Sequence, residues 1–251
     1  MRNSKSQPRQ SHITRTLVHW FGLLLFALIC LLWTPLALLL LALLPETPSR
    51  TRFGRRVIRT GFTAYLWLLK SLGILDITIN GNKEINSRPP ALIAPNHPSI
   101  IDAVILLSLV PDCACILKSK LLNHPLFGAG ARLAGYISNS STHEMIRSAV
   151  RELREGRSVL MFPEGTRTHT PPLLPLKLSP FIVAKKAHAP LRSVVIRCPA
   201  GFLAKETLLS APHVLPVNIS VAFSTEFFIT DGDVRSTADR LEQHLRNALV
   251  Q

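Results

Sequence analysis

Two polar residues in an otherwise apolar stretch give the first indication of chemistry. His97 follows the apolar segment 91–95, and Asp102 comes five residues later among isoleucine, alanine and valine. A carboxylate buried without a partner is costly, so Asp102 needs one, and His97 is the nearest candidate in sequence. A histidine held by a carboxylate through one ring nitrogen can act as a general base through the other. The spacing therefore predicts a His–Asp pair that takes the proton of a hydroxyl group.

A second polar string, FPEGTR at residues 162–167, leaves an expected buried strand further along the chain. Gly165 permits close backbone approach, and Arg167 offers a planar guanidinium suited to phosphate. Each string alone has an ordinary structural interpretation. FPEGTR could be a polar turn, and His97 and Asp102 could be a turn histidine and a satisfied buried acid. Their joint occurrence in this order favours a functional site.

Together, NHPSIID at residues 96–102 and FPEGTR resemble the glycerolipid acyltransferases, the family that includes 1-acylglycerol-3-phosphate acyltransferase. Such enzymes move a fatty acyl group from a thioester to a hydroxyl. The resemblance implies that His97 is the general base and that Asp102 orients it. It also implies a set of substrate-binding residues, namely Glu164, Gly165, Thr166, Arg167 and Lys118. It implies no metal and no cofactor, with an acyl-CoA or acyl carrier protein thioester as the donor substrate.

The chain departs from the family pattern between these strings. Lys118, Pro125, Gly128 and Gly135 match a block that ends, in relatives, on an arginine that helps hold glycerol phosphate; residues 138–140 here are Ser-Asn-Ser. A lysophosphatidic acid-like acceptor is the first expectation. A specialised acceptor, such as a glycolipid, aminolipid or pigment lipid, is the alternative because that arginine is missing.

Two other classes of function remain as alternatives. A thioester or lipid hydrolase would use water as the acceptor, although the chain has no G-x-S-x-G nucleophile elbow. A non-enzymatic basic membrane protein would need neither a buried Asp102 nor the FPEGTR loop. Nucleic acid is not an expected partner, because no RNA-binding aromatic signature is present and aromatic residues make up 6% of the chain.

Charge and hydropathy place the first third of the chain at a membrane. Residues 1–75 contain ten Lys/Arg and one acid, and the remainder contains nineteen Lys/Arg and fourteen acids. The basic residues of this third flank an uncharged run of 28 residues, 17–44, which is long enough to cross a bilayer. We expect either a single span or a hairpin that turns near Thr34 and Pro35. Membrane lipids are thus expected both as acceptor and as environment.

Three segments follow from this pattern. Residues 1–16 are a basic tail, 17–73 a membrane anchor followed by an amphipathic helix over 53–73, and 74–251 an α/β acyltransferase domain. The amphipathic helix lies either at the membrane interface or against the core. The active site is expected on the cytoplasmic face of the membrane, the inner membrane if the protein is bacterial. The four cysteines are predicted to be free thiols.

From residue 74 on, strands alternate with helices. Strands are expected at 75–79, 91–94, 113–117, 136–138, 158–162, 191–197 and 219–223. Helices are expected at 100–110, 142–155, 180–188 and 236–249. This alternation predicts an α/β fold, a mixed central sheet flanked by helices, with an N-terminal membrane-embedded helical segment.

Overall fold

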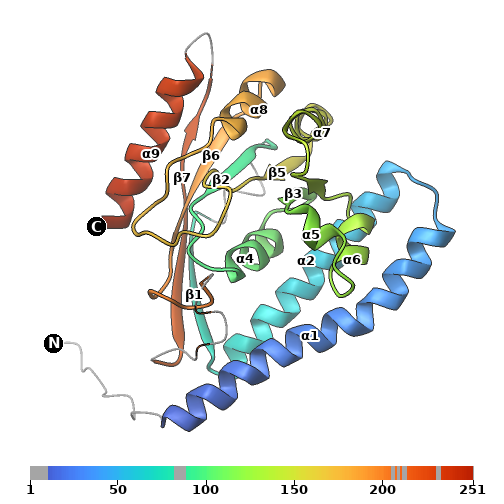
Figure 1. The fold of residues 1–251 in the computed structure, drawn as a ribbon, viewed down its shortest axis with the longest axis vertical. Helices are drawn as coiled ribbons and strands as arrows, with labels where there is room; N and C mark the ends of the chain where they lie inside the picture. The colour runs from blue at the N-terminus through green and yellow to red at the C-terminus, as the bar shows by residue number, and fades with distance from the viewer. Residues whose placement is uncertain are drawn as a thin grey trace.

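A mixed seven-stranded sheet forms the centre of the computed structural model, which describes residues 11–81, 89–204, 207, 210, 214–229 and 233–250. The strand order is β1-β7-β6-β2-β5-β3-β4. Five neighbouring strands, from β6 to β4, run parallel to one another, and β7 and β1 run in the opposite direction. The predicted α/β fold with a mixed central sheet is confirmed (Figure 1).

All seven expected strands are present, some with different ends. They are β1 (Leu75–Asn80), β2 (Leu92–Pro95), β3 (Cys113–Leu117), β4 (Ile137–Ser138), β5 (Ser158–Leu160), β6 (Leu191–Arg197) and β7 (Val217–Phe227). β7 is longer than predicted because it pairs with β6 on one side and β1 on the other. β5 ends two residues before the predicted Phe162, which leaves a longer connection into the FPEGTR loop.

Helices cover the two faces of the sheet with separate cores. On one face, α2 (Pro48–Ser71) and α4 (Ile101–Leu109) pack against strand residues such as Ile93 and Leu160. On the other face, α7 (Thr142–Arg154), α8 (Ser179–Ala187) and α9 (Val234–Val250) pack against their neighbours Leu92 and Val159. This division follows from the alternation of side chains along each strand.

The first apolar segment forms one continuous helix, α1 (His12–Leu43). Of the two alternatives for this segment, the hairpin near Thr34 and Pro35 is wrong. The helix continues through Pro35, and the chain turns only at residues 44–47, before α2. The helix also begins at His12, so the last part of the predicted tail is helical. By length and composition α1 is apolar enough to cross a membrane, and it is the one such helix within the described part of the chain.

α1 lies along the α/β domain rather than apart from it (Figure 1). The Tyr65 hydroxyl of α2 donates to the Gly22 carbonyl at 3.1 Å, and the Thr34 hydroxyl donates to the Leu126 carbonyl at 3.0 Å. Trp33 packs on Gly130, where a Cβ would come within 2.7 Å of its indole nitrogen. The opposite face of α1 is an exposed row of large apolar residues, among them Leu17, Phe21, Leu24, Leu28, Leu31 and Leu32.

Two short helices after β3 were not predicted, α5 (Ser119–Leu122) and α6 (Gly128–Leu133). α6 has the sequence GAGARL, and two glycines in six residues weaken any helical signal. Its small residues permit the close contact with α1. The helix predicted over 53–73 begins earlier, at Pro48. It faces the core with Tyr65, Leu66 and Leu69 and leaves Trp67 exposed.

Candidate active site

The predicted site residues gather at one edge of the sheet. Strands β2, β5 and β3 are parallel neighbours, so their carboxyl ends lie side by side. His97 follows β2, the FPEGTR loop follows β5, and Lys118 follows β3. Ligands of open α/β sheets bind at this edge, outside the carboxyl ends of the strands.

His97 and Asp102 are in direct contact. The Nδ1 atom of His97 lies 3.0 Å from Oδ2 of Asp102, which is completely buried in the first turn of α4. The same carboxylate oxygen accepts a hydrogen bond from the backbone N–H of Ser99 at 2.8 Å. Burial raises the pKa of Asp102, against the opposing effect of the hydrogen bond and charge of His97 and of the Ser99 N–H. With Nδ1 occupied by the carboxylate, Nε2 of His97 is the ring atom available to a substrate.

Glu164 joins the two strings. Its carboxylate accepts hydrogen bonds from the backbone N–H of His97 at 2.8 Å, from the Thr168 hydroxyl at 2.8 and 2.9 Å, and from the backbone N–H of Leu174 at 2.9 Å. The Thr168 N–H also donates to the His97 carbonyl at 2.8 Å. Glu164 is 3% exposed. Its oxygens are therefore engaged by the protein itself, and it fixes the position of the His97 backbone.

The other predicted substrate-binding residues of the loop surround that junction. Gly165 has φ +70°, and a Cβ there would come within 2.7 Å of the side chain of Lys177, so the position requires glycine. Thr166 is half-buried. Arg167 donates through Nη1 to the Leu203 carbonyl at 3.1 Å. Burial lowers the pKa of Arg167, and the nearby charge of Asp102 opposes that effect.

Lys118 is exposed at the end of β3. It lies at the same carboxyl edge as His97, with its side chain exposed, and its role in the site stays a prediction. The polar run at 138–140 ends the neighbouring strand β4. There the backbone N–H of Asn139 donates to the Leu117 carbonyl at the end of β3. The side-chain oxygen of Asn139 accepts a hydrogen bond from the Ser119 N–H at the start of α5. The hydroxyl and amide groups of residues 138–140 therefore border the carboxyl edge of the sheet on the β4 side.

Three contributions to the site were missed from sequence. The ring of Phe162 stacks on His97 with centroids 3.8 Å apart. Asn96 exchanges two hydrogen bonds with the backbone of Ile196, at 2.7 and 2.8 Å, and so fixes the turn after β2 to β6. Leu203, at φ +50°, presents its carbonyl to Arg167 and to the Ile100 N–H. Only Asn96 and Phe162 had a signal, since both stand inside the quoted strings.

Within the described residues, no group of three or more His, Cys, Asp or Glu side chains is arranged to hold a metal ion. The Cys198 thiol at the end of β6 lies near Asp102, and burial first, then that charge, raises its pKa to about 12. It is therefore a neutral thiol. The His97–Asp102 pair is the arrangement at this edge that can accept a proton.

Comparison with known proteins supports the resemblance of this chain to acyltransferases. The acyltransferase family model matches residues 76–197. A 1-acyl-sn-glycerol-3-phosphate acyltransferase of Cocos nucifera is 30% identical over 166 residues, which cover 63% of this chain and 52% of that protein. A lyso-ornithine lipid O-acyltransferase of Rhizobium meliloti is 32% identical over 152 residues, covering 59% of this chain and 46% of that protein. The matches thus span about half the length of these curated relatives.

The fold also has a solved counterpart. The crystal structure of the 1-acyl-sn-glycerophosphate (LPA) acyltransferase PlsC from Thermotoga maritima matches with a TM-score of 0.73 at 16% identity, covering 95% of this chain and 97% of that one. The match extends over α1 and α2 as well as the sheet, since so little of either chain is left out. The family model and the curated relatives, with the His97–Asp102 pair and the FPEGTR loop inside the matched residues 76–197, identify the chain as a member of the glycerolipid acyltransferase family.

Proposed function

We propose that this protein is a membrane-bound O-acyltransferase that moves a fatty acyl group from an acyl-CoA or acyl carrier protein thioester to the hydroxyl of a lysophosphatidic acid-like lipid. The observation that carries the proposal is the His97–Asp102 hydrogen bond, 3.0 Å long and tied through Glu164 to the FPEGTR loop. Hydrogen bonds to a buried carboxylate hold the imidazole in one tautomer, which is what a general base requires.

The proposed reaction follows from that tautomer. Nδ1–H of His97 donates to Asp102, and Nε2 takes the proton of the acceptor hydroxyl as its oxygen attacks the thioester carbonyl. A C–O bond forms and the C–S bond breaks, and the proton passes from His97 to the departing thiolate. The products are the acylated lipid and a free thiol. Asp102 stabilises the imidazolium formed on the way, and no covalent acyl-enzyme is needed.

Cations at the carboxyl edge suit a phosphate-bearing acceptor. Arg167 is held in place by the Leu203 carbonyl, Lys118 is exposed beyond β3, and Lys177 lies against Gly165. A guanidinium fixed by one protein contact keeps other donors for phosphate oxygens. These three cations support the lysophosphatidic acid-like acceptor although residues 138–140 hold no arginine.

A specialised acceptor is the second candidate. It is favoured by the hydroxyl and amide groups at residues 138–140, which can bind a neutral or zwitterionic headgroup as well as a phosphate. A relative named for a lyso-ornithine lipid acceptor matches this chain as well as those named for 1-acylglycerol-3-phosphate do. The two candidates differ in how strongly they depend on Arg167.

α1 supplies the proposed attachment to lipid. Its apolar residues are exposed on the side away from the domain. Of the 18 consecutive residues with the highest mean hydropathy, 6% are buried inside the protein. α1 contacts α2 and α6 through the face opposite to its exposed row, so that row forms one outer side of the molecule. We infer that the bilayer meets this side, with the active site toward the cytoplasm.

The first experiment measures acyl transfer by the purified full chain in detergent. Labelled palmitoyl-CoA is the donor, and lysophosphatidic acid, lyso-ornithine lipid and water alone are compared as acceptors. His97→Ala is the control, with an expected loss of about 10²- to 10⁴-fold because the base is removed. Arg167→Ala should chiefly raise KM for lysophosphatidic acid.

Each outcome separates two candidates. Acylation of lysophosphatidic acid that depends on both His97 and Arg167 supports the main proposal. Acylation of lyso-ornithine lipid alone, dependent on His97 but little affected by Arg167→Ala, favours the specialised acceptor. Release of free palmitate without transfer to any lipid favours a hydrolase, and near-normal turnover by His97→Ala would contradict the general-base role.

A further inference from the structure

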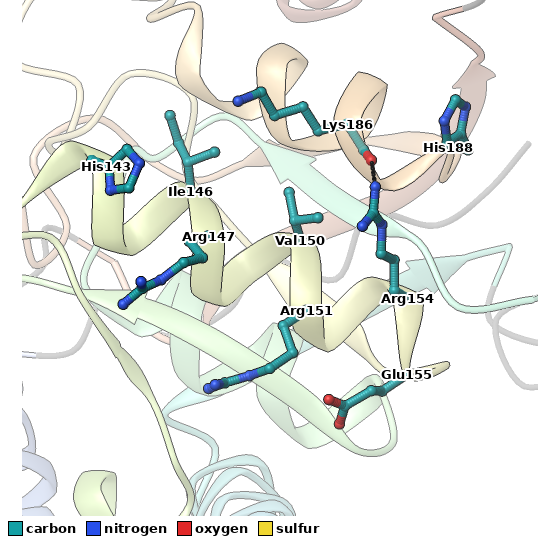
Figure 2. A pocket seen from close by; sticks show the side chains of 9 residues that line it. All are labelled: His143, Ile146, Arg147, Val150, Arg151, Arg154, Glu155, Lys186 and His188. Carbon is teal, nitrogen blue, oxygen red and sulfur yellow. Dashed lines mark hydrogen bonds between the residues drawn. The ribbon is translucent and has the colours of Figure 1, made fainter.

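A basic groove runs along α7 on the outer surface of the molecule. It has a volume of about 680 Å³ and is lined by residues of α7, with Lys186 and His188 from the end of α8. Figure 2 shows Ile146 and Val150 pointing from α7 toward α8, while Arg147 and Arg151 extend on the other side of α7. The half-buried Ile146 and the buried Val150 therefore form an apolar floor, with Arg147 and Arg151 on one side and, on the other, Lys186 of α8 beside the Arg154 guanidinium.

The cations of the groove are not neutralised by the protein. Among the described residues, no carboxylate lies within ion-pair distance of Arg147, Arg151 or Lys186. Glu155 is the one acid that lines the groove, and it is already paired with Arg157. Arg154 donates to the Lys186 carbonyl at 2.7 Å and keeps its full charge.

Stability of α7 does not account for this arrangement. Arg147 and Arg151 are four residues apart on one helix face, where like charges repel by a few tenths of a kcal/mol. Arginines in the last turn interact favourably with the helix dipole, but Arg147 is too far from the end to gain from it. An external anion would relieve this repulsion.

The position of the groove separates it from lipid. α7 and α8 cover the face of the sheet that is opposite to α2 and α4, and α1 packs on the side of α2 and α6. A bilayer that meets the exposed row of α1 therefore lies on the other side of the sheet. The natural occupant of the groove is a soluble anion.

We propose that the α7/α8 groove docks an acidic helix of a soluble carrier protein that brings the acyl thioester. This inference rests on the proposed acyl transfer, since it names the class of donor. Helix-in-groove docking places apolar side chains on an apolar strip and opposite charges along its rims, which is the pattern here. From His143 to Glu155 the rim extends about 18 Å, a length of three helical turns.

The groove also lies within reach of the active site. α7 begins four residues after β4, and the carboxyl ends of β4 and β2 are separated by three strand spacings, about 14 Å. A carrier docked along α7 can thus extend its thioester arm around the β4 end of the sheet, past Lys118, to His97.

The test compares two donors on the full chain in detergent. Palmitoyl-loaded acyl carrier protein and palmitoyl-CoA are used with the same acceptor, by the wild type and by Arg147→Glu/Arg151→Glu. The expected result is a drop in kcat/KM for the carrier protein of about tenfold or more, from a higher KM and with a weaker dependence on salt. Activity with palmitoyl-CoA should change by less than about twofold, because the His97 site is intact.

Arg235→Glu/Arg240→Glu on α9 is the matched control, because it makes the same change in net charge on the same face of the sheet. It should retain carrier-dependent activity. Equal losses with both donors, no loss with the carrier protein, or a wild type that uses palmitoyl-CoA alone would each overturn the docking proposal. In the last case, transfer that depends on His97 would leave the proposed function standing.

Discussion

The two faces of the sheet present opposite surfaces to their surroundings. On the α1 side, Leu24, Leu28, Leu31 and Leu32 are between 51% and 70% exposed. On the α7 side, the exposed residues include Arg147 and Arg151, and among the described residues no carboxylate lies within ion-pair distance of either. An apolar surface of this extent marks a membrane or protein contact, whereas unpaired cations attract a soluble anion.

The active site lies where the two faces meet. His97 precedes α4, which covers the α1 side, and the FPEGTR loop leads on toward α8, which covers the other side. In the proposed reaction, a lipid acceptor and a soluble donor would approach the same histidine from different sides.

The reaction centre itself should be the most sensitive point. Asp102→Asn is expected to lower kcat by about 10²- to 10⁴-fold, because an amide no longer fixes the Nδ1–H tautomer of His97. The substitution should not lower the stability of the fold. Burial raises the pKa of Asp102, so the folded state favours the neutral form, and the ionised carboxylate lowers stability increasingly as pH rises through that pKa. Replacing it by a neutral side chain removes this penalty.

Steady-state kinetics and thermal unfolding of Asp102→Asn check both expectations. The melting temperature at neutral pH should be unchanged or higher, although kcat falls. A variant with low activity and a clearly lower melting temperature would instead show that Asp102 serves mainly to hold the fold. In the wild type, activity should decline with acidity at a higher pH than an ordinary aspartate would produce, because protonation of Asp102 removes the charge that stabilises the His97 imidazolium.

Much of the fold could be predicted because its signals are local. Short apolar runs bounded by turn residues marked all seven strands, and the cost of burying Asp102 indicated its contact with His97. The hairpin near Thr34 and Pro35, one of the two alternatives for the apolar segment, was wrong because proline is only locally a helix breaker. In the structure Thr34 donates to the Cys30 carbonyl at 2.8 Å and to Leu126, and tertiary contacts with α6 keep the helix continuous.

Other features depend on residues far apart in sequence. The Leu203 carbonyl reaches Arg167 across 36 positions, and Lys186 meets α7 only once both helices have packed. No pattern within one segment reveals such contacts. Glu164 is the instructive case, because its string was recognised while its hydrogen bond to the His97 N–H, across 67 positions, was not.

A buried ion network joins the two faces and offers a way to uncouple them. Arg55 of α2 bonds to the Ala134 carbonyl at 2.9 Å, to Asp112 at 3.1 Å and to Glu152 of α7 at 2.8 Å, and it is 3% exposed. Burial alone would raise the pKa of Glu152, but the hydrogen bond from Arg157 and the charge of Arg55 outweigh it, so the pKa is lowered. This stabilisation is present above the unfolded-state pKa and is lost as pH falls through the folded-state value.

Arg55→Met should therefore lower the free energy of unfolding by about 1–3 kcal/mol, since Glu152 keeps only Arg157 of its two arginine partners and the Ala134 carbonyl loses its donor. Denaturant unfolding measures the change. Arg55→Met/Glu152→Gln should recover part of the loss, because the buried carboxylate that has lost Arg55 is then neutral. A double variant less stable than the single one would show that Arg55 acts by packing and not through its charge.

The smallest effect is expected on the apolar face, where each side chain contributes a little. Leu28→Ser/Leu32→Ser on α1 should weaken binding to phospholipid vesicles by about 1–2 kcal/mol per residue, because both leucines are exposed in the protein and become buried only in lipid. Vesicle flotation measures the binding, and Val250→Ser, at a still more exposed apolar position on α9, is the control. Catalysis on detergent-dispersed acceptor should be unchanged, since neither leucine contacts the carboxyl edge. Equal vesicle binding by the leucine variant and the control would mean that α1 does not face the bilayer, and the difference between the two faces would then need another cause.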